Sequence, residues 1–210
     1  MDLRNGRRRY AGFALLGLAG LWNLGILPTA PRLQLSDGKP TWSELRDAPD
    51  RASRLEARLG EVASGVAGRP VSVRCDSLSD IRGSVEPGGV VQFSGTSPAN
   101  YARIRYDICA QLRRLHRDHG AGEGAEARAV EVLAHESLHL RGVKDEASAE
   151  CYAIQFIPRV ARGLGATVAN AEVLHGLALR AYPYHPREYL SPECRSGGAL
   201  DLHGSLPPAA

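Results

Sequence analysis

The sequence has no excess of basic residues outside its N-terminus. The chain has 210 residues and a formal net charge of +3. The first nine residues alone supply this charge, since they hold four arginines and one aspartate, and the remainder is close to neutral. A protein that binds nucleic acid needs a basic stripe on its folded body. We therefore expect no nucleic acid among the partners.

The sequence also lacks any C-x-x-C unit and any internal repeat. Its four cysteines are widely separated along the chain. Zinc sites built from cysteine usually draw two ligands from one such closely spaced pair. A cysteine-rich zinc site is therefore not expected, and neither is a solenoid of repeats.

The N-terminus carries a targeting pattern. Arginines within residues 4–9 precede an uncharged, mostly apolar run at 10–27. This pattern is typical of a signal peptide or a signal anchor, with a buried core helix as the remaining alternative. We favour the uncleaved anchor, because the run is just long enough to span a bilayer and Pro31 follows the candidate cleavage residue Ala30. The protein would then be a single-pass cell-membrane protein with its C-terminal domain extracytoplasmic, or secreted if the segment is cleaved.

An extracytoplasmic location favours disulfides. Four cysteines form two bonds in three alternative pairings. We prefer Cys75–Cys109, which would join a strand to a helix, and Cys151–Cys194, which would join the proline-rich tail to the core. Free buried cysteines are the alternative.

Composition divides the chain into four parts. Residues 1–27 are the targeting segment, 28–42 a linker, 43–195 the folded domain and 196–210 a flexible tail. Hydrophobic periodicity predicts an α+β fold, mostly helical with a small three-stranded antiparallel sheet. The expected helices cover residues 43–66 with a break at Pro49, 108–116, 125–140, 146–162 and 168–181, and the expected strands cover 71–75, 90–93 and 101–106.

The pattern His135-Glu136-Ser137-Leu138-His139 lies in one of these predicted helices. Histidines four positions apart point to the same side of a helix, about 6 Å apart along its axis. This spacing suits two ligands of one tetrahedral zinc ion (Zn2+). Glu136 could take the proton of a water molecule activated by that metal. Two surface histidines beside a glutamate are the alternative.

Acidic residues after the motif supply candidates for a third zinc ligand. Residues 141–144 can form a tight loop that folds the next helix back beside the first. Glu146 would then lie near His139, with Glu150 one turn further on the same face. We favour Glu146 as the ligand and Glu150 as the acceptor for a second histidine nitrogen, with Glu150 as the alternative ligand. Asp145 is expected to cap the helix.

These residues together resemble the gluzincin branch of zinc metallopeptidases, in which the third ligand is a glutamate on the helix after the motif. The stretch Glu146 to Ala153, with Pro158 soon after, looks like the ligand helix of ImmA/IrrE-type peptidases. The whole pattern also looks like short membrane-anchored zincin-like proteins of actinobacteria. The resemblance implies a minimal zincin-like fold, peptide hydrolysis, and an edge strand that binds extended peptide, for which residues 101–106 are the candidate.

The expected function is therefore zinc-dependent hydrolysis of a peptide or protein, with Glu136 catalytic. The alternative is a non-catalytic, zinc-stabilised binding domain at the cell surface. Hydrolysis also needs a group that stabilises the oxyanion. His175, Tyr184 and His185 are candidates by their chemistry, and each could instead be structural.

Overall fold

The computed structural model describes residues 49–76, 88–119, 123–202, 204 and 206. The predicted targeting segment and the predicted linker lie outside these residues. Across the described ranges, no helix is both long enough and apolar enough to cross a membrane.

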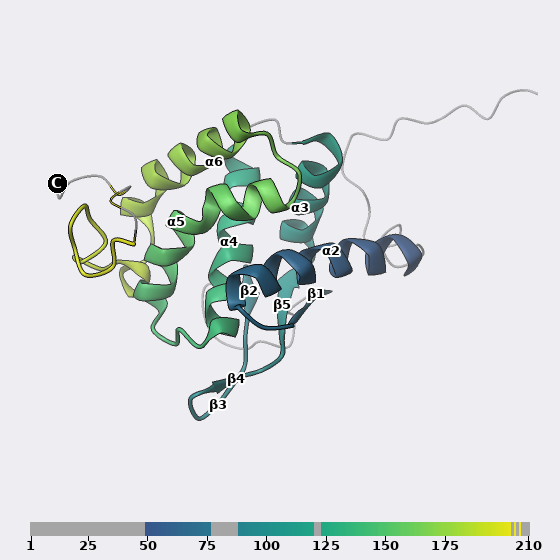
Figure 1. The fold of residues 1–210 in the computed structure, drawn as a ribbon, viewed down its shortest axis with the longest axis horizontal. Coiled ribbons are helices and arrows are strands. Elements are labelled where there is room, and N and C mark those ends of the chain that lie inside the picture. The colour runs from purple at the N-terminus through teal and green to yellow at the C-terminus, as the bar shows by residue number, and fades with distance from the viewer. Residues whose placement is uncertain (1–48, 77–87, 120–122, 203, 205, 207–210) are drawn as a thin grey trace, which may run out of the picture. The chain divides into compact units, whose positions relative to one another are not determined.

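Helices make up most of the described chain, and one of them lies at its centre (Figure 1). The helices are α2 (Pro49–Ala67), α3 (Tyr106–Asp118), α4 (Gly124–Arg141), α5 (Glu146–Gly163) and α6 (Val168–Ala181), followed by the 3₁₀ turns η1 (Tyr182–Tyr184) and η2 (Arg187–Tyr189). Helix α4 packs against each of the four other α-helices that the structure describes. Every residue from Ala129 to Leu140 is buried, as expected for a helix enclosed on all sides.

Short local signals fix the ends of α4 and the start of α5. Glu123 and Glu126 form a capping box at the N-terminus of α4. Gly142 ends that helix with φ of 107°, a conformation that glycine adopts without strain. Asp145 then caps α5 by accepting a hydrogen bond from the Ser148 amide. The two helices are thus joined by a minimal connection and lie against each other.

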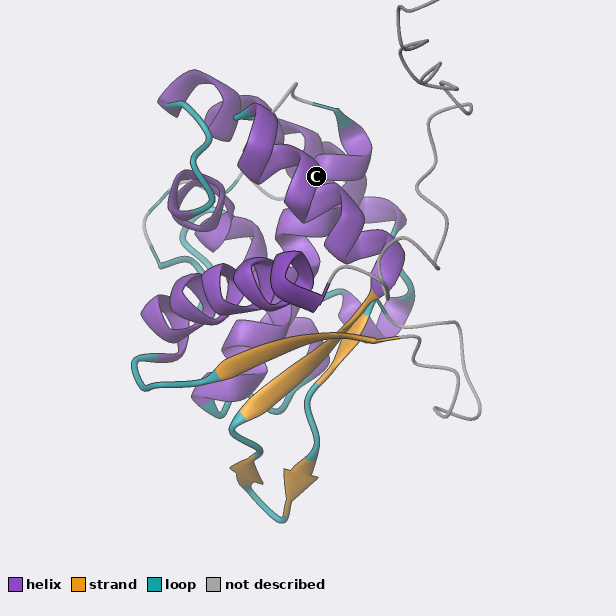
Figure 2. Ribbon diagram, turned by 90° about the vertical axis from the view of Figure 1, so that its right-hand side faces the viewer, coloured by secondary structure: helices purple, strands orange, loops and turns teal. Residues whose placement is uncertain are grey.

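The sheet is small and mixed (Figure 2). Its strands are β1 (Ser72–Asp76), β2 (Gly89–Val90) and β5 (Tyr101–Arg105), in the order β1-β5-β2. β1 runs parallel to β5, and β2 runs antiparallel to it. β3 (Phe93–Ser94) and β4 (Ser97–Pro98) form a separate two-stranded ribbon.

The predicted α+β class is confirmed, but the prediction of a fully antiparallel sheet is wrong. The chain between β1 and β5 is long enough for the crossover that a parallel pair requires. The strand predicted at 101–106 is present as β5, but its predicted place at the edge of the sheet is wrong. β5 is paired on both sides, and β2 occupies the edge. Ala102 and Ile104 are fully buried on the helix-facing side of this central strand.

Two disulfides connect the elements, and both predicted pairings are confirmed. Cys75–Cys109 joins β1 to α3, and Cys151–Cys194 joins α5 to the segment after η2. Part of the predicted flexible tail also packs on α5. Gln155 donates to the Leu200 carbonyl at 2.8 Å and accepts from the Leu202 amide at 2.7 Å.

Candidate metal centre

Helix α4 supplies three chemically reactive side chains to one buried region. His135, Glu136 and His139 are all buried, because α5 and β2 cover this part of α4. The imidazole rings of the two histidines lie 4.5 Å apart between centroids. The helical spacing thus brings both rings to the same side, as the sequence predicts.

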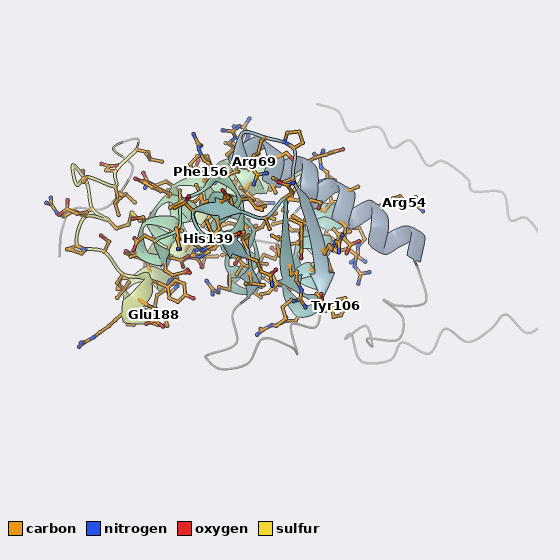
Figure 3. The ribbon with its side chains drawn as sticks, turned by 90° about the horizontal axis from the view of Figure 1, so that it is seen from below. Arg54, Arg69, Tyr106, His139, Phe156 and Glu188 are labelled. Atoms are coloured by element: carbon orange, nitrogen blue, oxygen red, sulfur yellow. A yellow bond between two sulfur atoms is a disulfide. The ribbon has the colours of Figure 1, made fainter. Side chains whose placement is uncertain are left out.

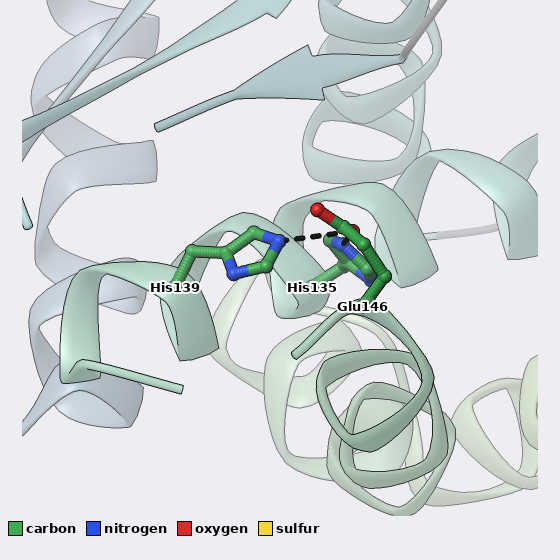
Figure 4. Close-up of side chains that lie close together, drawn as sticks. All are labelled: His135, His139 and Glu146. Atoms are coloured by element: carbon green, nitrogen blue, oxygen red, sulfur yellow. Dashed lines mark hydrogen bonds and ion pairs between the residues drawn. The ribbon is translucent and has the colours of Figure 1, made fainter. Parts of the chain in front are cut away.

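Glu146 approaches both histidines from the first turn of α5 (Figure 4). Its Oε2 lies 3.0 Å from Nε2 of His135 and 3.2 Å from Nε2 of His139. Donor atoms around a tetrahedral zinc ion with bonds of about 2.0–2.1 Å are about 3.3 Å apart. The three groups therefore have the chemistry and nearly the mutual spacing of a zinc ligand set, and their ligand atoms all lie within 4.8 Å of one another.

The second nitrogen of each histidine is held by a fixed acceptor. Nδ1 of His135 lies 2.6 Å from Oε2 of Glu150, and Nδ1 of His139 lies 2.6 Å from the Val143 carbonyl. An ionised carboxylate and a carbonyl only accept hydrogen bonds, so each Nδ1 carries a proton. This arrangement leaves both Nε2 atoms as the ones available to a metal.

In the metal-free chain, the surrounding carboxylates raise the pKa values of His135 and His139 and so favour their protonated forms. Burial by itself lowers the pKa of His135, but hydrogen bonds to Glu146 and Glu150 outweigh it and raise that pKa to about 10. Hydrogen bonds from His135 and His139 lower the pKa of Glu146 to about 2. The pKa of Glu150 is also about 2, because hydrogen bonds from His135 and His185 outweigh the effect of its burial.

Glu136 has the opposite environment. It is buried, and its Oε2 accepts no hydrogen bond from the described residues. Burial raises the pKa of its carboxyl to about 7. β2 lies directly over this side chain, since a Cβ atom added to Gly89 would be 2.6 Å from Cγ of Glu136. A buried carboxyl with a near-neutral pKa is suited to accept and release a proton.

These groups form the floor of a cleft of about 530 Å³. β2 and Phe93 border the cleft, and so do five residues of the segment 182–190, which we call the cleft wall: Tyr184, His185, Pro186, Glu188 and Tyr189. Figure 3 marks His139 on α4 and Glu188 on the cleft wall, both of which line this cleft. The opening exposes Glu146, whose side chain remains 46% accessible.

The candidates for oxyanion stabilisation are in three different places. Tyr184 lines the cleft but is 88% exposed. His185 lines the cleft and directs Nδ1 at Glu150, 2.8 Å from Oε1, so it contacts the carboxylate that also holds His135. His175 lies on α6 and borders a separate groove with Gln155 and Arg159. The structure thus does not bring His175 to the centre.

Tyr189 lies at the centre although the sequence analysis did not select it. Its ring centroid is 5.7 Å from that of His135. Burial and the nearby Glu146 and Glu150 carboxylates raise the pKa of its hydroxyl, which therefore stays protonated at neutral pH. Only the 3₁₀ turn η2 directs this side chain into the cleft, and no periodic pattern in the sequence signals such a turn.

Comparisons of the chain with protein families, with curated proteins and with solved structures give no match. The gluzincin assignment therefore stays a prediction. It rests on the His135–His139 pair and on the carboxylates of α5.

Proposed function

We propose that this protein is a zinc-dependent hydrolase that cleaves peptides or proteins. One observation carries the proposal. Two buried histidines, each held through Nδ1, direct Nε2 at the Glu146 carboxylate, directly beside the buried carboxyl of Glu136. This combination of a ligand set and a proton acceptor lies in an open cleft.

The ligand set has a defined chemical role. His135, His139 and Glu146 would hold the ion, and zinc so held supplies Lewis acidity and lowers the pKa of water. Glu150 and the Val143 carbonyl keep the two imidazoles in the orientation that binding requires.

Glu136 acts as the proton carrier. Its carboxylate takes a proton from the attacking water and holds it, and burial, which raises the pKa of this carboxyl, favours the protonated form. It then delivers the proton to the leaving amine. Tyr189, which also lines the cleft, donates a hydrogen bond from its hydroxyl to the oxygen that becomes negative in the transition state.

The burial of Glu136 favours catalysis over the alternative of a non-catalytic binding domain. A buried carboxyl oxygen without a hydrogen bond destabilises the fold by about 1–3 kcal/mol. A zinc ion that only stabilises the structure would not require this group. Such a loss of stability is expected where a reaction uses the carboxyl.

The test combines zinc content with hydrolysis of a dye-labelled unfolded protein. We expect one zinc ion per chain in both the wild type and Glu136→Gln, with hydrolysis lowered about 10²–10⁴-fold in the variant. Glu172→Gln, on α6 beside the separate groove, is the matched control and should behave as wild type. Full activity of Glu136→Gln would exclude this mechanism. Stoichiometric zinc without turnover, together with unfolding on chelation, would instead support the binding domain.

A further inference from the structure

Glu150 joins the cleft wall to a candidate zinc ligand. One of its oxygens, Oε2, lies 2.6 Å from Nδ1 of His135, and the other, Oε1, lies 2.8 Å from Nδ1 of His185. Glu150 is only 2% exposed, so neither contact competes with bulk water. A chain of two short hydrogen bonds therefore runs from the metal centre to the wall.

His185 sits between two buried carboxylates. Its Nε2 is 3.9 Å from Oε1 of Glu131, an oxygen that accepts no hydrogen bond from the described residues. Arg128 also approaches this pair, at 3.1 Å from Glu131 and 3.6 Å from Glu150, but its side chain is half-exposed. The contact from His185 is therefore shorter and more buried than the contact from Arg128, and it is the one that joins Glu150 to the wall.

The wall packs on α5 through η2 and on α6 through η1, and the Tyr182 amide donates to the Ala178 carbonyl of α6. Among the described residues, the contact of His185 with Glu150 is the short side-chain hydrogen bond that joins the wall to α5. The internal hydrogen bonds of the wall are those of the two 3₁₀ turns, and the Tyr182 hydroxyl accepts from the Ser191 amide at 3.0 Å. The disulfide to α5 comes only at Cys194. The wall also carries Tyr189, so a shift of this segment would move that ring relative to His135.

We infer that His185 is a positioning residue that couples zinc binding at His135 to the position of the cleft wall. The inference rests on the zinc site of the proposed function. A metal ion on Nε2 of His135 orients the ring, the ring orients Glu150, and Glu150 orients His185 and the wall. Coupling of this kind is reciprocal, so loss of the His185 contact must also weaken zinc binding.

The experiment measures amide hydrogen exchange in the wall on the full-length chain, with and without zinc. The reporters are the amides of His185, Tyr189 and Leu190, which donate within the 3₁₀ turns. We expect zinc to slow their exchange about tenfold in the wild type and less than about twofold in His185→Ala. Zinc affinity of the variant, measured by competition with a chelator, should fall by the same factor of about ten.

Two further variants separate positioning from simple destabilisation. His185→Asn retains a donor near the place of Nδ1 and should restore the coupling, whereas His175→Ala, outside the cleft, should leave it as in the wild type. Equal protection by zinc in wild type and His185→Ala would overturn the inference while leaving the proposed function intact. A second zinc ion per wild-type chain, lost in His185→Ala, would also overturn it by making His185 a ligand. Failure of the wild type to bind zinc at all would overturn both.

Discussion

Three glutamates around His135 have very different proton affinities. Burial raises the pKa of Glu136 to about 7, whereas hydrogen bonds from histidine lower the pKa values of Glu146 and Glu150 to about 2. Groups whose environments separate their pKa values in this way take different roles in acid–base chemistry. The contrast supports the proposed proton transfer by Glu136, with charge-bearing contacts made by the two glutamates of α5.

The first residue-scale prediction concerns Gly89→Ala. A Cβ at this position would meet Cγ of Glu136 at 2.6 Å, so either β2 or the carboxyl must shift. Since a misplacement of about 1 Å can lower a rate by about 10²-fold, we expect hydrolysis to fall strongly. Zinc content should remain at one ion per chain, because no ligand is displaced.

Gly124→Ala is the matched control for this change. Gly124 begins α4, and an added Cβ there would meet nothing within 4 Å. The control should keep full activity and gain slightly in stability. Wild-type kinetics in Gly89→Ala would show that β2 does not constrain Glu136.

The second residue-scale prediction concerns pH and the metal-free protein. The pKa of His135 is raised from 6.5 to about 10, so its stabilising contribution is complete below pH 6.5 and is lost as pH rises through 10. The pKa of Glu136 is raised from 4.5 to about 7, so this group increasingly destabilises the fold as pH rises from 4.5 to 7. Both effects predict a lower melting temperature at pH 9.5 than at pH 6.

Saturating zinc should weaken or reverse this dependence. Zinc competes with protons for the imidazoles, so it binds more tightly as pH rises. His135→Gln removes the titrating group and should flatten the metal-free profile. A metal-free wild type that is more stable at pH 9.5 than at pH 6 would contradict the hydrogen-bonded, protonated state of His135.

At the scale of elements, the connection between α4 and α5 positions the candidate zinc ligands. Gly142, with φ of 107°, ends α4, and the next residue provides the carbonyl that holds His139. Gly142→Ala strains this turn, and we expect it to lower stability by about 1 kcal/mol or more. We also expect weaker zinc binding, measured by chelator competition, because the Val143 carbonyl and Glu146 both move with the turn.

Gly68→Ala controls for the strain alone. Gly68 also has a positive φ, 73°, and lies after α2, away from the cleft. Its replacement should lower stability comparably without changing zinc affinity. Equal zinc affinities in both variants would mean that the turn does not position the ligands.

The sequence predicts the helices well and the sheet poorly, for physical reasons. The start of α5 at Glu146 follows from Asp145, and the end of α4 follows from Gly142, because both are local capping signals. Strand order and direction depend on contacts between distant segments, so the parallel pairing of β1 with β5 has no local signal.

The same distinction holds for the candidate site. His135, Glu136 and His139 share one helix, so their spacing alone predicts that they lie together. Tyr189 and Gly89 reach the centre only through the packing of the cleft wall and of β2. His175 was predicted from its chemistry alone, which does not tell where α6 packs.

At the scale of the whole molecule, the two disulfides hold different regions. Cys75–Cys109 connects the sheet to α3, whereas Cys151–Cys194 connects α5 to the chain just beyond the cleft wall. They close stretches of similar sequence separation, 34 and 43 residues. Chain entropy therefore gives each a similar stabilising effect, about 4 kcal/mol.

Replacing each pair by serines separates stability from cleft geometry. Because the entropic effects are similar, we expect both double variants to lose comparable free energy of unfolding, measured by urea denaturation. Only Cys151→Ser/Cys194→Ser frees the segment that follows Tyr189, so only this variant should show faster amide exchange in the wall and a higher KM. The other double variant is its matched control, since it leaves the α5 bond intact. Equal KM values in the two variants would show that the His185–Glu150 contact holds the wall without help from the disulfide.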